Sequence, residues 1–141
     1  MIRKVLAGTV LAAGIAAQAL AVAAPSDAAT IRPASSGGGC SGSVAVGDGW
    51  SFNSCISAHN NAIFPDGYVT ASGSRGSSCT IWVDVIRNGD QISHRANPCS
   101  VGTGAGIVGV ETGGSGTFFT AIYVQINGAL SSEVLSPNEY Q

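Results

Sequence analysis

The amino-acid sequence predicts an all-β protein, a single small antiparallel β-sandwich with about seven short strands. Runs of β-branched and aromatic residues alternate with clusters of Gly, Asn, Asp and Ser. No stretch after the N-terminal segment keeps the apolar spacing of an amphipathic helix without a glycine interruption. Two of the runs end in Asn-Gly, the strongest short hairpin signal. A small barrel is the alternative architecture.

The N-terminal segment has the layout of a secretory signal peptide. Arg3 and Lys4 precede an uncharged stretch at 5–24, and small residues follow it. Small side chains at −3 and −1 favour cleavage after Ala28, with cleavage after Ala23 as the second candidate. A membrane anchor is the alternative, but alanine and glycine make this stretch only weakly hydrophobic. We therefore expect export, with no stable membrane insertion after cleavage.

The chain that remains after cleavage is small and mildly acidic. Its 113 residues suffice for one domain with a modest core. It holds four arginines, no lysine and seven acidic residues, a net charge of −3. This composition excludes a nucleic-acid partner, because neutralising phosphates requires a dense cationic face. It also excludes membrane-surface binding through a polybasic patch.

Four cysteines in an exported chain indicate two disulfides. Cys40, Cys55, Cys79 and Cys99 are separated by 15, 24 and 20 residues. Because zinc sites favour short CxxC pairs, we expect no metal site. Three pairings are possible. Sequential pairing, Cys40–Cys55 and Cys79–Cys99, is favoured because a predicted hairpin brings the second pair together.

The predicted organisation has four parts, divided at changes in composition. They are a signal peptide at 1–28, a flexible segment at 29–39, a β-sandwich domain at 40–137 and a C-terminal tail at 138–141. Strands are expected at 44–46, 50–58, 68–72, 80–87, 90–97, 107–112, 117–126 and 129–135. A short helical turn is the alternative within 54–62. Phe-Pro-Asp-Gly at 64–67 predicts a turn, because Pro fixes φ and Gly permits positive φ.

The clearest element is a hairpin whose two-residue loop is Asn88-Gly89. Such a loop fixes the register, so that Val83 should face His94 on an apolar, buried side of the hairpin. His94 is therefore expected to be a partly buried structural histidine.

The opposite side of the same hairpin is mixed in character. The register places Trp82 opposite Arg95 there, where a cation–π contact is possible. Since this side could meet solvent, Trp82, Arg95 and Asp84 are the candidate binding residues. The other tryptophan, Trp50, is expected in the core.

Catalytic signals are weak. The letters GxGxxG at 104–109 lack the strand before and the helix after that dinucleotide binding requires. A nucleophilic triad is possible in composition, but the chain has no GxSxG elbow and no spare cysteine. His59 is expected in a polar loop. We assign no catalytic residue, no cofactor and no metal.

One segment carries a likeness to known proteins. The span Cys79–Cys99 (CTIWVDVIRNGDQISHRANPC), with the signal peptide and the Gly/Ser/Ala-rich mature chain, resembles small secreted actinobacterial proteins with an immunoglobulin-like β-sandwich. The resemblance implies that fold and no assigned activity. The spacing of Cys40 and Cys55 resembles that of small secreted subtilisin inhibitors of the same bacteria. That likeness fails at 80–82, where a regular strand replaces a proline-containing reactive loop. No functional residue is carried over.

These observations predict a secreted, non-enzymatic module, extracellular or cell-wall associated, that binds an unknown protein or cell-surface polymer or coats a surface. A secreted protease inhibitor is the first alternative, with 96–106 around Cys99 as its candidate reactive loop. A small hydrolase is the weaker alternative. It would need His59 or His94 beside an acid in a concave pocket.

Overall fold

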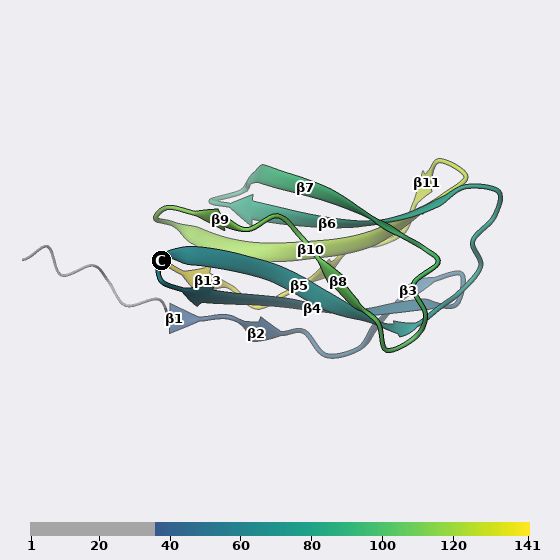
Figure 1. Ribbon diagram of the computed structural model, residues 1–141, viewed down its shortest axis with the longest axis horizontal. Helices are drawn as coiled ribbons and strands as arrows, with labels where there is room; N and C mark the ends of the chain where they lie inside the picture. Colours follow the sequence, from purple (N-terminus) through teal and green to yellow (C-terminus); the bar gives the residue numbers. More distant parts are fainter. Residues whose placement is uncertain (1–35) are drawn as a thin grey trace, which may run out of the picture. The chain divides into compact units, whose positions relative to one another are not determined.

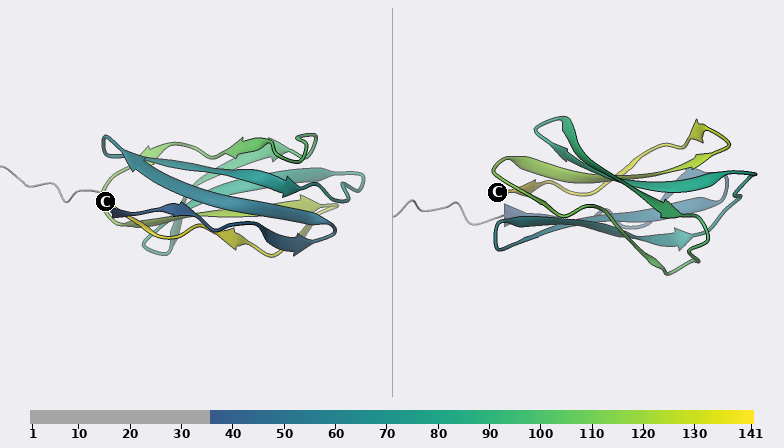
Figure 2. Two further views of the ribbon diagram at one scale, coloured as in Figure 1. Left: turned by 90° about the horizontal axis from the view of Figure 1, so that it is seen from below. Right: turned by 45° about the horizontal axis from the view of Figure 1, so that its top comes forward.

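The computed structural model describes residues 36–141, which form two antiparallel β-sheets packed against each other (Figure 1). This confirms the predicted all-β sandwich. Figure 2 shows the layers from two further directions, with β4 and β5 in one and β6, β7 and β10 in the other. No helix in this range is long and apolar enough to cross a membrane. The predicted signal peptide and its cleavage sites lie outside the described residues.

Sheet A has seven strands around the long central strand β10. Its order is β1-β13-β10-β6-β7, and β11 and β12 also pair with β10. The strands are β1 (Ser36–Gly37), β6 (Cys79–Arg87), β7 (Asp90–Pro98), β10 (Thr117–Ile126), β11 (Ala129–Leu130), β12 (Val134–Leu135) and β13 (Glu139–Tyr140).

Sheet B has six strands around the hairpin of β4 and β5. Its order is β2-β4-β5-β8, with β3 on β4 and β9 on β5. The strands are β2 (Gly39–Cys40), β3 (Val44–Gly47), β4 (Trp50–His59), β5 (Ala62–Ala71), β8 (Gly106–Val108) and β9 (Thr112–Gly113). The thirteen strands of the two sheets exceed the number expected, because the predicted strands at 107–112 and 129–135 are each split in two and short strands occur near both ends of the described range.

Four hairpins turn through two residues that both have positive φ, the geometry of type I′ loops. These loops are Asp48-Gly49, Asn60-Asn61, Asn88-Gly89 and Asn127-Gly128. The two Asn-Gly loops were predicted. Each loop contains at least one Asn or Asp, the residues that adopt this backbone most easily after glycine.

The turn predicted at 64–67 is wrong, because this segment lies within β5. The helical alternative at 54–62 is wrong too, because this segment consists of the end of β4, the Asn60-Asn61 loop and the first residue of β5. The backbone N of Gly109 donates to the carbonyl oxygen of Pro65 at 2.8 Å. In an antiparallel ladder the N–H and C=O of one residue point to the same neighbour. The N–H that Pro65 lacks therefore faces the side where β8 and β9 pair with β5. Pro65 therefore interrupts the pairing of β5 with β8 and β9, but β5 itself continues through it.

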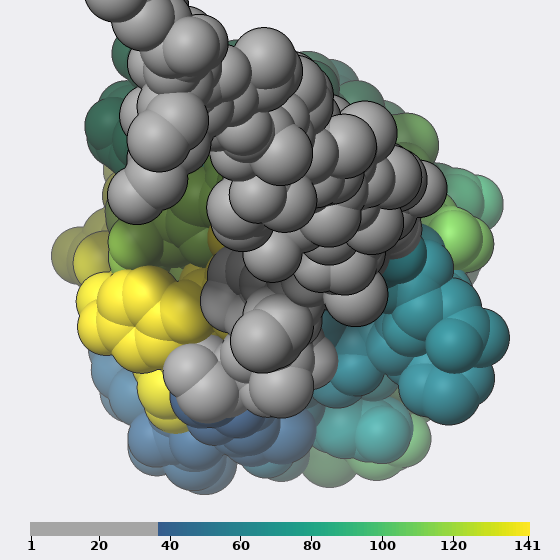
Figure 3. Space-filling view, turned by 90° about the vertical axis from the view of Figure 1, so that its left-hand side faces the viewer, coloured from purple at the N-terminus to yellow at the C-terminus, as the bar shows by residue number. Residues whose placement is uncertain are grey.

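The ordered domain is wider than the predicted 40–137. Ser36 pairs with Tyr140, and Glu139 pairs with Phe118 of β10, so parts of the predicted flexible segment and tail belong to sheet A. Figure 3 shows the C-terminal residues, yellow, beside the first described residues, dark blue.

Side chains from both sheets fill the interior in two clusters. Trp50 is fully buried, as expected, and its indole N–H donates to the carbonyl oxygen of Ser74 at 2.6 Å. The larger cluster consists of Val46, Trp50, Phe52, Val69, Ile81, Val83, Cys99, Ile107, Ile122, Val124 and Val134. The smaller consists of Ile56, Ile63, Val85 and Phe118.

The disulfides follow the predicted sequential pairing, Cys40–Cys55 and Cys79–Cys99. The first joins residues that are paired directly across β2 and β4. The second joins the start of β6 to the residue after β7, so it closes the open end of the predicted hairpin. Cross-links of this size contribute about 3 kcal/mol each in the chain-entropy model.

The β6–β7 hairpin has the predicted loop but not the predicted register. Ile86 pairs with Gln91 and Val85 with Ser93, so Ile92 is an extra residue in β7. This bulge lets Ile92 pack against the smaller core cluster.

Beyond the bulge, every residue of β7 lies on the face of the sheet opposite to the face that was predicted for it. His94 is paired with Asp84 rather than with Val83, and Arg95 is paired with Val83. Trp82 is paired with Ala96, so the predicted Trp82–Arg95 pair is wrong. A regular ladder would have buried the imidazole beside a valine, where its ring nitrogens would lack partners. The bulge places it beside a carboxylate instead.

Candidate binding surface

The outer face of sheet A is an aromatic and apolar surface. Successive side chains of a strand point to opposite faces, and those that alternate with the buried core positions point outward. The exposed Leu130 and Leu135 extend this face beyond β10. It comprises Trp82, Asp84, Ile86, Gln91, His94, Ala96, Phe119, Ala121, Tyr123, Gln125, Leu130 and Leu135.

A nearly buried carboxylate lies at the centre of this face. The Asp84 side chain is 7% exposed. Its Oδ1 accepts from Nδ1 of His94 at 2.5 Å, and its Oδ2 accepts from Nε2 of Gln91 at 3.0 Å and from the Tyr123 hydroxyl at 3.2 Å. Three donors therefore compensate the desolvated charge.

The acceptor role of the carboxylate fixes the histidine tautomer. Nδ1 of His94 must carry the proton that it donates to Asp84. Gln91 Nε2 lies 3.0 Å from the same Nδ1, and we interpret this as two donors converging on one carboxylate. Neutral His94 then has its lone pair on Nε2.

The Trp82 indole lies parallel to the His94 imidazole. Their centroids are 3.9 Å apart and their planes differ by 15°. The indole N–H donates to Oε1 of Gln125 at 3.2 Å. Trp82 is half-buried, whereas the His94 side chain is 42% exposed. The indole is thus held by a hydrogen bond to a side chain of β10, and the imidazole by one to a side chain of β6.

The predicted binding residues divide between two sites. Trp82 and Asp84 belong to the stack, but Arg95 does not. At an inward-facing position of an edge strand, Arg95 reaches across to sheet B and donates to the carbonyl oxygen of Gly109 at 3.3 Å. Asn97 donates to the carbonyl oxygen of Val108 in the same way, at 3.1 Å. These side chains cover the edges of β7 and β8, which limits edge-to-edge pairing with other chains.

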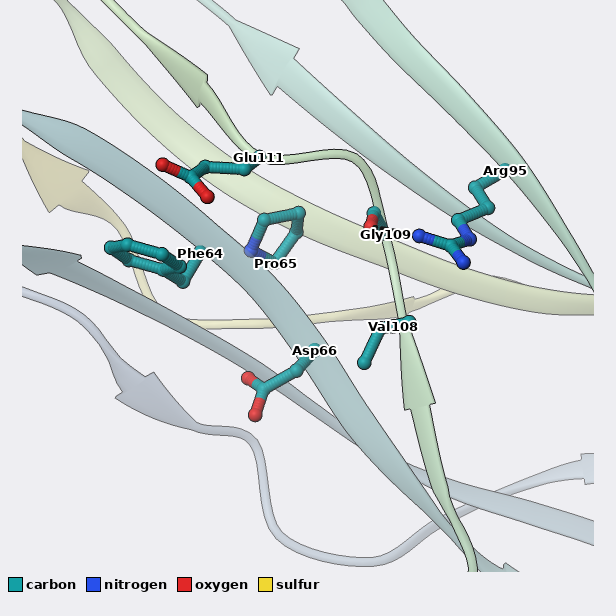
Figure 4. A pocket seen from close by; sticks show the side chains of 7 residues that line it. All are labelled: Phe64, Pro65, Asp66, Arg95, Val108, Gly109 and Glu111. Carbon is teal, nitrogen blue, oxygen red and sulfur yellow. Dashed lines mark hydrogen bonds between the residues drawn. The ribbon is translucent and has the colours of Figure 1, made fainter.

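A hollow of about 360 Å³ lies at this covered edge. Figure 4 shows Phe64, Asp66 and Glu111 around Pro65, with the Arg95 guanidinium beside Gly109. Burial raises the pKa of the Asp66 carboxyl. No ion pair joins Arg95 to either carboxylate in the described part of the chain, where Asp84–His94 is the only such contact.

Only one of the two histidines lies beside an acid, as the hydrolase alternative requires. The hydrogen-bond partners of His94 within 36–141 are Asp84 and Gln91, with no Ser, Thr or Cys among them. His59 ends β4 beside the Asn60-Asn61 loop and is exposed. The expectation that His94 lies on the apolar face was wrong.

The loop proposed for protease inhibition is folded back on the domain. Gly104 donates to the carbonyl oxygen of Val69 at 2.7 Å, and Val69 donates to that of Ala105 at 3.0 Å. Val101 packs against the core, and Cys99 is buried. These contacts hold Cys99, Val101, Gly104 and Ala105 against the rest of the domain.

Two residues of the surface could not be found from the sequence. Tyr123 and Gln125 join it through the pairing of β6 with β10, which lie far apart in the chain, whereas Gln91 lies opposite Ile86 as the two-residue loop predicts. The dense strand at 117–126 was predicted, but no local signal fixes its register against β6.

Among residues 36–141, no three His, Cys, Asp or Glu side chains lie close enough to hold a metal ion. Comparison with protein-family models, with curated proteins and with solved structures finds no match.

Proposed function

We propose that this chain is a secreted, non-enzymatic binding module that attaches to a cell-surface polymer through the outer face of sheet A. The observation that carries the proposal is the Trp82–His94 stack, held on a buried carboxylate within a face of aromatic, aliphatic and amide side chains. Pre-ordered aromatic side chains contribute binding energy at little cost in conformational entropy. A flat, open face also suits an extended polymer better than a small substrate.

The extracellular location rests on separate observations. The N-terminal segment has the charge and hydropathy of a signal peptide. Two disulfides and the absence of free cysteines in the described chain are compatible with an oxidising compartment. The resemblance to small secreted actinobacterial β-sandwich proteins supports the same location.

Retention on insoluble polymers tests the proposal. Purified mature protein is incubated with peptidoglycan, cellulose and chitin, and the bound fraction is measured after washing. We expect retention on at least one polymer and its loss in Trp82→Ala. Tyr68→Ala is the matched control, because Tyr68 is an exposed aromatic residue of sheet B, 45% exposed.

Thermal unfolding separates a lost contact from a lost fold. Truncating a fully buried aromatic residue costs about 3–5 kcal/mol, whereas half-buried Trp82 should cost less. Should Trp82→Ala unfold, His94→Ala serves as the second variant, since it removes the exposed half of the stack. The proposal fails if no polymer retains the protein, or if the folded variants bind as the wild type does.

A further inference from the structure

The polar groups of the outer face of sheet A have an unusual division of roles. Buried Asp84 accepts from His94 Nδ1, Gln91 Nε2 and the Tyr123 hydroxyl, so each of these side chains points a donor inward. Each also keeps an acceptor, respectively the imidazole Nε2 lone pair, the amide Oε1 and the phenol oxygen lone pairs. Because these donors all point to the Asp84 carboxylate, the same side chains present their acceptors to solvent.

The remaining donors of the stack are also occupied. The Trp82 indole N–H donates to Gln125 Oε1 at 3.2 Å, and Gln125 Nε2 donates to the carbonyl oxygen of Gly128 at 3.4 Å. With His94 neutral, the face thus offers acceptors beside aromatic rings and few free donors. An acceptor that binding buries without a donor partner costs about 1–3 kcal/mol. A ligand must supply the donors.

The geometry points to a neutral, hydroxyl-rich saccharide as the ligand of this face. This inference rests on the proposed function and specifies its polymer. Sugar hydroxyls can donate to His94 Nε2 and Gln91 Oε1, and the apolar face of a sugar ring can lie on aromatic and aliphatic side chains. A shallow hollow lined by Gln91, Ile92, Ser93 and His94 lies beside the imidazole and is open to solvent.

A cationic ligand would also supply donors, and the charge of Asp84 would attract it. The carboxylate, however, is 7% exposed and already accepts three hydrogen bonds. An ammonium group on this face would lose hydration without reaching the charge directly. The neutral ligand therefore fits the site better.

The experiment uses soluble probes on the mature, disulfide-bonded protein. Cellohexaose and chitohexaose are titrated in parallel with fully O-methylated cellohexaose, which keeps the ring faces but has no hydroxyl donors. Binding is followed by NMR at the Trp82 indole N–H and at His94 Nε2. We expect one native oligosaccharide to shift both signals, and the methylated probe to bind at least about tenfold more weakly, which corresponds to about 1.4 kcal/mol.

Asp84→Asn is the positioning variant, because it leaves the identity of every outward-facing residue unchanged. An asparagine offers one acceptor oxygen and a donor NH₂. One of its three partners must then turn a donor outward, so we expect oligosaccharide affinity to fall about tenfold or more while the protein stays folded. Tyr68→Ala should bind as the wild type does.

The outcomes are distinguishable. Equal binding of native and methylated probes, or shifts confined to other residues, would overturn the saccharide inference. So would salt-sensitive binding of trilysine at the Trp82 and His94 signals in place of the sugars. If Trp82→Ala loses polymer retention but the wild-type protein responds to neither sugar, the saccharide inference fails and the proposed function stands. Unchanged sugar binding in Trp82→Ala would contradict both the saccharide inference and the proposed function.

Discussion

Nδ1 of His94 lies 2.5 Å from Oδ1 of Asp84, and this contact joins a half-exposed imidazole on an edge strand to a carboxylate that is almost sealed from solvent. The pair exists because one extra residue, Ile92, turns the second half of β7 over. A buried charge without donors would be strongly destabilising. The bulge therefore makes possible both the stack and the retention of Asp84 within the face.

Replacing His94 should destabilise the fold through its partner. His94→Ala leaves the Asp84 carboxylate one donor short and removes the ring stacked on Trp82. We expect the free energy of unfolding to fall by about 1–3 kcal/mol, measured by urea denaturation with an unchanged slope. His59→Ala, at an exposed strand end, should stay within about 0.5 kcal/mol of the wild type. Equal losses in the two variants would contradict the role given to the pair.

Tyr123 should ionise only at strongly alkaline pH. Burial, then the charge of Asp84 and its hydrogen bond, then the charge of Glu133, raise the pKa of Tyr123 from 10.0 to about 12. Ultraviolet titration of tyrosinate should show a step at about pH 12 that is absent from Tyr123→Phe. Asp84→Asn should move this step toward lower pH. A step that stays in place would mean that Asp84 does not contribute.

The same shift has a consequence for stability. The folded state holds the phenolic proton more tightly than the unfolded state, so its stabilising effect is complete below pH 10.0 and is lost as pH rises to about 12. Wild-type stability should therefore fall relative to that of Tyr123→Phe across this interval. Parallel curves for the two proteins would exclude the linkage.

Of the four type I′ loops within residues 36–141, Asn60-Asn61 alone contains no glycine. Asn61 has φ 63°, a left-handed conformation that glycine adopts without a Cβ penalty. Asn61→Gly should therefore raise the free energy of unfolding by about 0.5–1 kcal/mol, measured by thermal or urea unfolding.

Asn127→Gly is the contrasting variant at another loop of this type. Asn127 Oδ1 accepts from the backbone N of Ser77 and Ser78 and from the Ser77 hydroxyl, at 2.9–3.1 Å. Losing these bonds should destabilise the protein by about 1 kcal/mol or more. A loss of stability in Asn61→Gly as well would show that its side chain holds the loop in a way the structure does not reveal.

The sequence predicts those features of this fold that local chemistry determines. Asn88-Gly89 and Asn127-Gly128 turn as expected, because few residues tolerate positive φ. Asp48-Gly49 carries the same signal and could have been found in the same way. Pro65 shows the limit of such signals, since its fixed φ suits an extended strand as well as a turn.

The candidate site was only partly predictable because it depends on register. Trp82 and Asp84 were placed correctly on the outward face of β6. The bulge at Ile92 has no local signature, yet it exchanges His94 and Arg95 between the two faces. Tyr123 joins through a strand pairing that spans about forty residues of chain, and such non-local pairing depends on the whole core.

Asp66→Asn should stabilise the protein in a manner that depends on pH. Burial beside Pro65 raises the pKa of the Asp66 carboxyl above its ordinary value of 3.8. The folded state therefore favours the protonated acid, and stability is lost as pH rises through the raised pKa. Asparagine removes this loss, so the variant should melt at a higher temperature than the wild type near pH 7, with the difference vanishing below pH 3.8. Asp48→Asn, at an exposed loop, is the control, and its difference in melting temperature from the wild type should not depend on pH in this way. A constant difference across the pH range would assign the effect to hydrogen bonding rather than to the burial of charge.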